Sequence, residues 1–388
     1  MDGTMLDLRP FIRDFLHSLN VIGVRDFLRF LMFKNMIVYR IAESWQGDFQ
    51  VLEEALQKSL FAECGATQER SVGWTPPRGE QHGLLAESVA NQWMLRFMSE
   101  SKMLPASVLN RKVEEKAAHI EALEGRKPGK KEKKELKDEA KLDLLPMAFT
   151  KQGGMWVWID PEARTLVLDT SSQSRADEVV TLLVESLPGF ALALLDTQTS
   201  PQAAMSNWLL TQEPPAGFVI DRECELKAAD ESKAVVRYAR HPLDIDEVRQ
   251  HIEQGKLPTK LAMSWDDRVS FVLTEGLQLK KVALLDAVLD GQSQDDGGFD
   301  TDVAIATGEL SRLIPDLIEA LDGEGRTGLG QALLGASVAA KSPSVTSLPG
   351  TVNPVASLPV AAPRGASQGT VTGPKEAPAD QAPEEAPF

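Results

Sequence analysis

Cysteine and histidine are scarce in this sequence, and their spacing supports no metal site. The two cysteines, Cys64 and Cys224, lie far apart and form no CxxC pair, which gives no support to a disulfide framework or a cysteine-ligated zinc. The five histidines are scattered along the chain, so only a coincidence of the fold would gather them around a metal. We therefore expect a protein of the reducing cytoplasm that holds no metal and no other cofactor.

Motifs of several common enzyme classes are also missing. The sequence has no GxxxxGK[ST] loop, no HExxH pair and no GxSxG elbow. The stretch DRECELK (221–227) places Glu225 and Lys227 close to Asp221, a faint likeness to nuclease centres in which carboxylates hold Mg²⁺. Such a short match is frequent by chance, so charged residues that flank an edge strand are the favoured interpretation. We expect no enzymatic activity.

The sequence also lacks a long uninterrupted apolar run. Residues 1–31 are apolar, but charged side chains such as Arg13, Asp14 and Arg25 interrupt them, as they would not in a signal peptide or a membrane span. We therefore expect neither export nor a membrane partner. Two interpretations of 1–31 stay open: an amphipathic surface helix, or the favoured one, an N-terminal extension that is not native and precedes a natural start at Met32.

The C-terminal part has too few large apolar side chains to form a core. From residue 340 on, it is rich in Pro, Ala, Ser, Thr and Gly, with Phe388 as its one aromatic residue. Such a segment cannot bury enough apolar area to offset its ordering entropy. We predict a disordered tail over 326–388.

Positive charge is outnumbered, with 41 Lys and Arg against 57 Asp and Glu and a formal net charge of −16. This argues against a protein that coats DNA by its overall charge, since non-specific affinity comes mainly from neutralised phosphates. A local basic surface remains compatible with an acidic exterior, because the field depends on where the charges lie.

Strand and helix patterns alternate between these two ends. We predict strands in MIVYRIA (36–42), MWVWID (155–160), TLVLDT (165–170), FALALLD (190–196), GFVID (217–221) and RVSFVL (268–273). We predict helices in VLEEALQKSLF, ADEVVTLLVESL, DIDEVRQHIEQG and GELSRLIPDLIEAL. Thr307 is the expected N-cap of the last helix, with Glu309 near the positive end of its dipole. The short connections suit hairpins, so the predicted class is α+β with antiparallel or mixed sheets.

The densest group of lysines lies between 125 and 149. Apolar spacing predicts a helix over 106–124, Gly125 and Pro128 interrupt it, and a second helix is expected over 130–144, before Pro146. Together the two would form a protruding helical hairpin. At roughly 100° per residue, one arc of about 100° on the second helix carries five lysines: Lys130, Lys133, Lys134, Lys137 and Lys141. Spacing alone does not decide between a solvated helix face and a stripe that meets phosphates.

Several segments in order resemble the RdgC family of bacterial recombination-associated proteins over about 32–325. They are MFKNMIVYRI (32–41), GWTPP (73–77), LLPMAF (144–149), HIEQGKLPTKLAMSWDDRVSFVL (251–273) and FDTDVAIATGELSRLIPDLIEALDGE (299–324). The regions expected are an N-terminal α+β region (32–105), a helical finger (106–149) and a central and C-terminal α+β region (150–325).

The resemblance implies a ring-shaped homodimer that binds DNA without sequence preference. It implies a preference for double-stranded over single-stranded DNA, restraint of the recombinase RecA during recombination and replication-fork repair, and a place in the cytoplasm on the nucleoid. In such rings basic side chains line the hole, which would reconcile the lysine-rich helix with an acidic chain.

The resemblance also implies site residues. Phe149 corresponds to an exposed apolar residue that helps to close a dimer contact; an ordinary core phenylalanine is the alternative. Lys256 and Lys260 fit a phosphate-contacting loop, and Arg240 fits a basic family segment from which His241 and Pro242 depart. The candidate DNA-binding residues are Arg111, Lys112, Lys130, Lys131, Lys133, Lys134, Lys137, Lys141, Arg240, Lys256 and Lys260.

A second function class stays open. The helical hairpin could instead dock onto a recombination protein, and the affinity for DNA would then be incidental. Binding to DNA in the absence of the recombinase would separate the two hypotheses.

Overall fold

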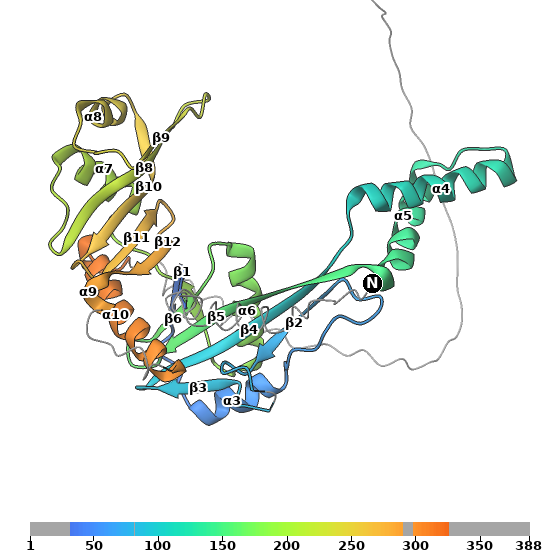
Figure 1. Cartoon of the computed structure of the whole chain (residues 1–388), viewed down its shortest axis with the longest axis horizontal. Coiled ribbons are helices and arrows are strands. Elements are labelled where there is room, and N and C mark those ends of the chain that lie inside the picture. Colours follow the sequence, from blue (N-terminus) through green and yellow to red (C-terminus); the bar gives the residue numbers. More distant parts are fainter. Residues whose placement is uncertain (1–31, 81, 290–297, 326–388) are drawn as a thin grey trace, which may run out of the picture. The chain divides into compact units, whose positions relative to one another are not determined.

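The computed structural model describes residues 32–80, 82–289 and 298–325 (Figure 1). The predicted N-terminal extension (1–31) and the predicted tail (326–388) lie outside the described residues. The described residues combine helices with twelve strands, and every strand pair among them is antiparallel. The α+β class is therefore confirmed.

One group of strands is built around β4 and β5, which pair from Trp93 opposite Ile159 to Met103 opposite Phe149. Its strands, in spatial order, are β2 (Arg70–Thr75), β4 (Gln92–Met103), β5 (Phe149–Asp160), β6 (Thr165–Leu168) and β1 (Asn35–Ile41), with β3 (Ala86–Val89) beside β4 and β7 (Leu192–Leu194) beside β1. Side chains alternate between the two faces, as the pleat requires. Val157 and Ile159 of β5 face one core, and Trp158 between them faces the other.

The remaining strands continue the sheet from β1, where Asn35 lies opposite Lys280. In spatial order they are β12 (Leu279–Leu284), β11 (Val269–Thr274), β10 (Lys256–Trp265), β8 (Phe218–Ala228) and β9 (Val235–Ala239). The expectation that Lys256 and Lys260 lie in a loop is wrong, because both lie on β10. That strand forms because its backbone pairs with β8 on one side and β11 on the other.

Helices cover the sheet with two apolar cores. Helices α3 (Phe49–Gln57) and α6 (Gln173–Ser186) pack on one face of β1, β4, β5 and β6 through residues such as Leu52 and Leu183. Helices α7 (Pro201–Thr211), α8 (Asp246–Glu253) and α10 (Phe299–Ala320) belong to the second core, which holds the buried side chains of β8, β10 and β11. A short helix, α9 (Asp286–Leu289), follows β12.

Helix α10 begins earlier than expected. Its first residue is Phe299, and Thr307 lies within it, almost fully buried, with its hydroxyl donating to the carbonyl of Val303. The N-cap prediction for Thr307 is therefore wrong. Val303 and Ala306 are buried against the core, and this packing extends the helix toward the N-terminus, beyond the predicted cap at Thr307.

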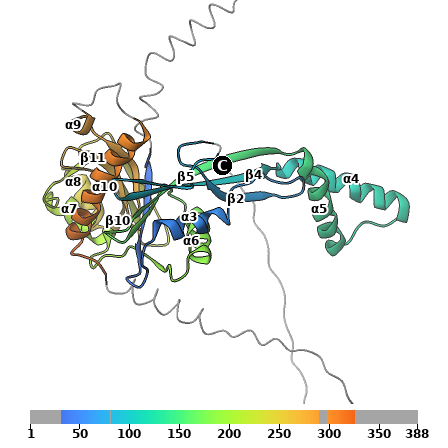
Figure 2. The same cartoon turned by 90° about the horizontal axis from the view of Figure 1, so that it is seen from below.

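Two helices lie between β4 and β5 in the chain (Figures 1 and 2). They are α4 (Ala106–Glu124) and α5 (Lys130–Leu144), and both have the bounds predicted from the sequence. Gly125 ends α4 with a φ of 69°, the left-handed conformation that glycine adopts at no steric cost. The short 3₁₀ helix η1 (Leu145–Met147) then leads into β5.

Residues 32–80, 82–289 and 298–325 include no helix with both the length and the apolarity needed to cross a bilayer.

Candidate nucleic-acid interface

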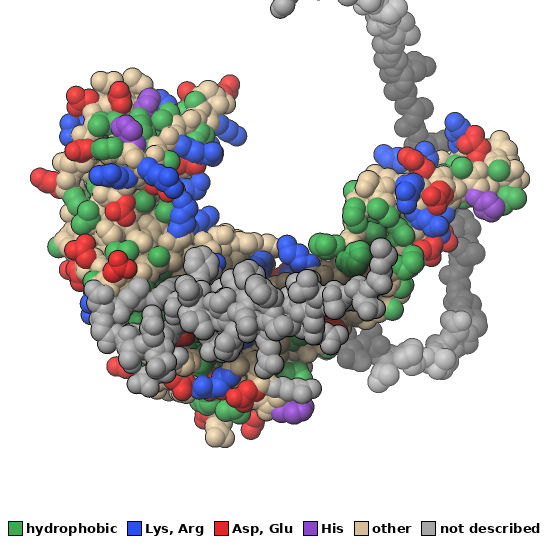
Figure 3. Space-filling model, in the orientation of Figure 1, with side chains coloured by type: hydrophobic (Ala, Val, Ile, Leu, Met, Phe, Trp, Pro, Cys, Tyr) green, Lys and Arg blue, Asp and Glu red, His purple; other side chains and the backbone are tan. Residues whose placement is uncertain are grey.

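A cavity of about 460 Å³ is lined by residues of β8, β9, β10, β11 and β12, together with Asn35 of β1. Its lining includes the apolar or aromatic side chains of Cys224, Tyr238 and Val272. The charged lining consists of Arg237, Lys260, Lys280, Lys281, Glu223 and Glu225. Cations outnumber carboxylates in this lining, so the cavity has the charge that a phosphate requires. Figure 3 shows Lys and Arg side chains gathered over this group of strands.

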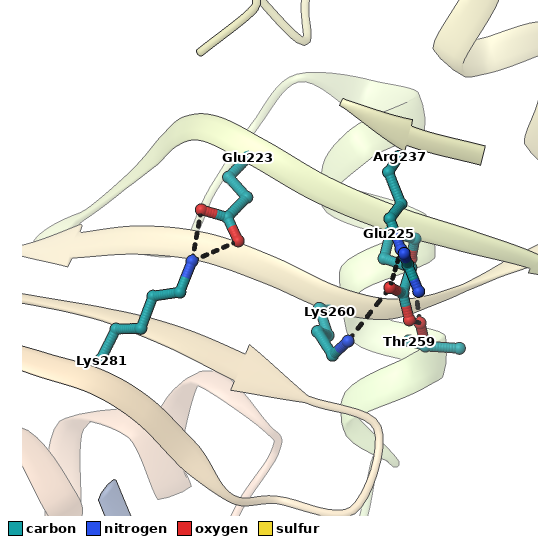
Figure 4. A network of polar contacts seen from close by, with 6 residues as sticks. All are labelled: Glu223, Glu225, Arg237, Thr259, Lys260 and Lys281. Carbon is teal, nitrogen blue, oxygen red and sulfur yellow. Dashed lines mark hydrogen bonds and ion pairs between the residues drawn. The ribbon is translucent and has the colours of Figure 1, made fainter. Parts of the chain in front are cut away.

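Glu225 lies at the centre of the larger charged group (Figure 4). It sits on β8 directly opposite Arg237 of β9 and Lys260 of β10. Its Oε2 atom accepts from Arg237 Nε at 2.6 Å and from Lys260 Nζ at 3.0 Å, and its Oε1 atom accepts from the hydroxyl of Thr259 at 2.8 Å. One carboxylate thus holds two cations in fixed places.

The hydrogen bonds keep Glu225 ionised. Partial burial by itself would raise the pKa of this carboxyl, whose side chain is 15% exposed. Hydrogen bonds from Thr259, Arg237 and Lys260 outweigh that effect and lower the pKa from 4.5 to about 2. Glu225 therefore carries a full negative charge at neutral pH.

A second ion pair crosses the cavity. Lys281 Nζ lies 2.7 Å from Oε1 and 2.8 Å from Oε2 of Glu223, although β11 and β10 separate their strands in the sheet order. No carboxylate in the described residues pairs with Lys280. Lys280 therefore keeps an uncompensated charge beside the cavity.

A β-bulge lets the consecutive residues Lys280 and Lys281 line one cavity. In regular strands such neighbours point to opposite faces. The pairing of β11 with β12 shifts between Ser270 and Val272, and Lys281 adopts a φ of 52°. Bulges of this kind turn side chains toward a site, and a left-handed conformation at a lysine costs free energy.

The lysines of α5 form a separate exposed surface. Leu136 and Ala140 are the buried residues of this helix. Lys131 lies 3.9 Å from Glu135, and Lys141 pairs with Glu69 of the segment before β2. The remaining lysines of the predicted stripe have no ion pair with any described residue: Lys130, Lys133, Lys134 and Lys137.

The other predicted residues are dispersed. Arg111 and Lys112 lie near the start of α4, and both are near Glu115. Arg240 is exposed just after β9, with a φ of 56°. Lys256 Nζ lies 3.0 Å from Nδ1 of His251. Of all the predicted cations, only Lys260 lines the charged cavity described above.

Phe149 is the first residue of β5 and is 82% exposed, so the alternative of a core phenylalanine is wrong. Met103 lies directly opposite it on β4, and Met103 and Met147 are exposed as well. Exposed large apolar side chains in one place indicate a contact surface.

In the nuclease-like stretch 221–227, the carboxylate of Glu225 is not free to bind a metal ion. This carboxylate is occupied by three donors, Thr259, Arg237 and Lys260. Burial raises the pKa of the Asp221 carboxyl above its ordinary value. No group of three or more potential metal ligands occurs in the part of the chain that the structure describes.

Sequence reasoning missed Arg237, Lys280 and Lys281. Arg237 stood in the basic segment RYARHP, and the pair of lysines in LKKVAL interrupts an apolar strand pattern. The sequence shows the lysine pair in LKKVAL, but only the pairing of the strands places Lys280 and Lys281 near Lys260.

A family model described as "Putative exonuclease, RdgC" matches residues 31–324. The chain belongs to the RdgC family. Among its relatives, Recombination-associated protein RdgC of Dechloromonas aromatica is 44% identical over 301 residues, which cover 76% of this chain and 98% of that protein. The protein of the same name from Bordetella pertussis is 41% identical over 300 residues, 76% of this chain and all of that protein (100%). The resemblance predicted from the sequence is thus confirmed.

The RdgC relatives are named for recombination, whereas the description of the family model reads "Putative exonuclease". Membership in the RdgC family therefore supports a recombination-associated protein and leaves the molecular activity to the site itself.

Proposed function

We propose that this RdgC-family chain binds DNA without sequence specificity, prefers duplex, and restrains RecA during recombination and replication-fork repair on the bacterial nucleoid. The observation that carries the proposal is the cavity lined by Arg237, Lys260, Lys280 and Lys281 in a chain with a net charge of −16. An acidic chain that concentrates cations on one strand face has a surface suited to a polyanion.

The unpaired lysines of α5 support the same function. Lys130 and Lys134, like Lys133 and Lys137, are like charges four residues apart, and each such pair costs an isolated helix about 0.2 to 0.5 kcal/mol. Phosphates would offset this repulsion. Contacts to phosphates carry no base information, so the binding is indifferent to sequence.

The proposal includes a ring-shaped homodimer with α4 and α5 as a helical finger. Its proposed regions are 32–105, the finger 106–149, and 150–325. Support for a dimer contact comes from the exposed apolar group of Met103, Met147 and Phe149 at the base of these helices. Burial of one phenylalanine at such a contact contributes roughly 2 kcal/mol.

The first experiment measures binding of a short fluorescent duplex at several salt concentrations. Lys134→Glu with Lys137→Glu on α5 should weaken binding and reduce the slope of log K against log salt by about 2, because each lost phosphate contact removes roughly 0.9. The control is Lys58→Glu, at an exposed lysine outside α5 and outside the cavity, compared with Lys134→Glu alone. Equal effects of these two single variants would contradict a role for α5.

The second experiment separates DNA binding from direct docking onto RecA. RecA-promoted strand exchange is measured with the same variants. If the protein acts through DNA, inhibition falls in proportion to the lost affinity for DNA. Full inhibition by a variant that no longer binds duplex would favour the protein-interaction alternative.

The described side chains support binding rather than hydrolysis of DNA, because Glu225 is already bonded to two cations. Incubation of closed circular duplex with the protein and Mg²⁺ should leave the circles intact. Nicking that Glu225→Ala abolishes would establish a nuclease instead.

A further inference from the structure

The carboxylates of the charged cavity differ in their bonding. Glu225 is enclosed by three donors, whereas both oxygens of Glu223 bond to the single ammonium of Lys281 (Figure 4). Each of these two carboxylates lowers the net charge of the cavity by one unit. The geometry gives them different consequences for an incoming anion.

We propose that Glu225 positions Arg237 and Lys260 to bind a DNA phosphodiester in this cavity, and that Glu223 competes with the phosphodiester for Lys281. The inference rests on the proposed DNA binding and assigns opposite roles to two acidic residues within that site.

The positioning role follows from the donors that remain free. A guanidinium has five N–H donors and an ammonium has three. Arg237 bonds Glu225 through Nε alone, so its two terminal nitrogens keep their donors, and its side chain is 72% exposed. Lys260 uses one donor for Glu225. The group of two cations and one carboxylate therefore presents convergent N–H donors and a residual positive charge.

Preorganisation explains how a negative charge can strengthen the binding of an anion. Free arginine and lysine side chains carry about 2 kcal/mol of rotamer entropy, part of which is lost on binding. Arg237 and Lys260 are the direct cross-strand neighbours of Glu225, and its carboxylate already restrains both of their side chains. A phosphodiester then meets donors that need no further ordering.

The competing role follows from the second ion pair. Lys281 and Glu223 are both partly exposed, and Glu223 bonds no cation besides Lys281 among the described residues. This pair has no net charge. A phosphodiester must draw the ammonium away from Glu223, so the carboxylate lowers the affinity for DNA and keeps the contact reversible.

The test measures affinity for a short fluorescent duplex, and its salt slope, with single variants of the full chain. Glu223→Gln should tighten binding about threefold and make the slope steeper by about 1, because Lys281 is released. Glu225→Ala should weaken binding about fivefold, although it too removes a negative charge. Glu225→Gln, which keeps an oxygen acceptor, should restore part of the loss. Glu43→Gln removes an exposed carboxylate elsewhere and should leave affinity nearly unchanged.

A second set of variants, which lacks the side chains of Arg237 and Lys260, tests whether Glu225 acts through these two cations. With Arg237→Ala and Lys260→Ala already present, Glu225→Ala should no longer weaken binding and should tighten it slightly. A loss of affinity that persists in this background would overturn the positioning role, because it would reflect damage to the sheet. Glu223→Gln affects an exposed pair, so it tests the competing role even where Glu225→Ala fails to fold.

The outcomes separate this inference from the proposed function. If Glu225→Ala and Glu223→Gln both tighten binding, Glu225 only screens charge and the inference fails. If no cavity variant alters binding while the α5 variant does, the DNA lies elsewhere and the inference fails while the proposed function stands. If the wild-type chain binds no duplex, the proposed function itself fails.

Inorganic phosphate distinguishes the DNA backbone from a free phosphate as the occupant. Thermal unfolding in phosphate or in chloride at constant ionic strength measures binding of phosphate alone, with the wild-type chain and with Arg237→Ala. If phosphate stabilises only the wild type while Arg237→Ala leaves the affinity for duplex unchanged, the cavity belongs to a free phosphate and the assignment to DNA is overturned. A loss of duplex affinity in Arg237→Ala supports DNA as the occupant.

Discussion

Lys260 of β10 and Glu225 of β8 are direct cross-strand partners, and Nζ of the first lies 3.0 Å from Oε2 of the second. Opposite charges in this register stabilise a sheet. The same pair also holds the ammonium group of Lys260 at the cavity, so one contact contributes both to the stability of the sheet and to the proposed binding of DNA.

The pair makes stability depend on pH in a defined window. Because the folded pKa of Glu225 is about 2 and its ordinary value is 4.5, the carboxylate stabilises the fold fully above pH 4.5 and loses this contribution as pH falls toward 2. Glu225→Gln should lower the free energy of unfolding at pH 7 by roughly 1 to 2 kcal/mol after allowance for solvent screening. Urea unfolding at pH 7, 4 and 3 checks whether the difference shrinks. A constant difference would contradict the assignment.

The backbone conformation of Lys281 should lower the stability of the fold while it places this side chain at the cavity. Its φ of 52° is unfavourable for a lysine and natural for a glycine. Lys281→Gly should raise the free energy of unfolding by about 1 kcal/mol and weaken duplex binding. Lys280→Gly is the matched control, because it removes the same side chain next door without relieving strain. It should lower stability by about 0.5 to 1 kcal/mol; a similar loss in Lys281→Gly would refute the strain.

The exposed position of Phe149 predicts an effect on assembly without an effect on folding. Phe149→Ser should leave thermal stability almost unchanged, since the side chain is 82% exposed. It should weaken the proposed dimer roughly thirtyfold, from about 2 kcal/mol of lost apolar burial. Sedimentation at several concentrations measures this. Leu84→Ser, at another exposed apolar residue, should not change assembly, and an intact Phe149→Ser dimer would exclude this contact.

Glu309 should matter for the attachment of α10. Its oxygens lie 2.7 Å from Nε and 2.6 Å from Nη2 of Arg268, and this hydrogen bonding lowers the pKa of Glu309 despite its burial. Glu309→Gln leaves the guanidinium without its charged partner, so the free energy of unfolding should fall by about 1 to 3 kcal/mol. The effect should fade in acid, where the unfolded carboxyl is protonated. Glu319→Gln, exposed on the same helix, should change stability by less than about 0.5 kcal/mol; equal losses would contradict the prediction.

Local sequence signals predicted the helices of the lysine-rich region well. The bounds of α4 and α5 follow from apolar spacing, from the break at Gly125 and Pro128, and from Pro146. The same kind of signal failed at Thr307. There the capping pattern lies inside α10, because packing of the preceding turns against the second core outweighs a single cap.

The sequence by itself determined the class of the fold, the family, and the charge segregation of α5, because these depend on composition and on neighbours within a few residues. Only the tertiary structure decided that Arg237, Lys260, Lys280 and Lys281 share one cavity with Glu223 and Glu225. Register across β8, β9 and β10 and a bulge in β12 bring these residues together. Pairing between distant strands depends on burial of whole sheet faces, which no short stretch of sequence encodes.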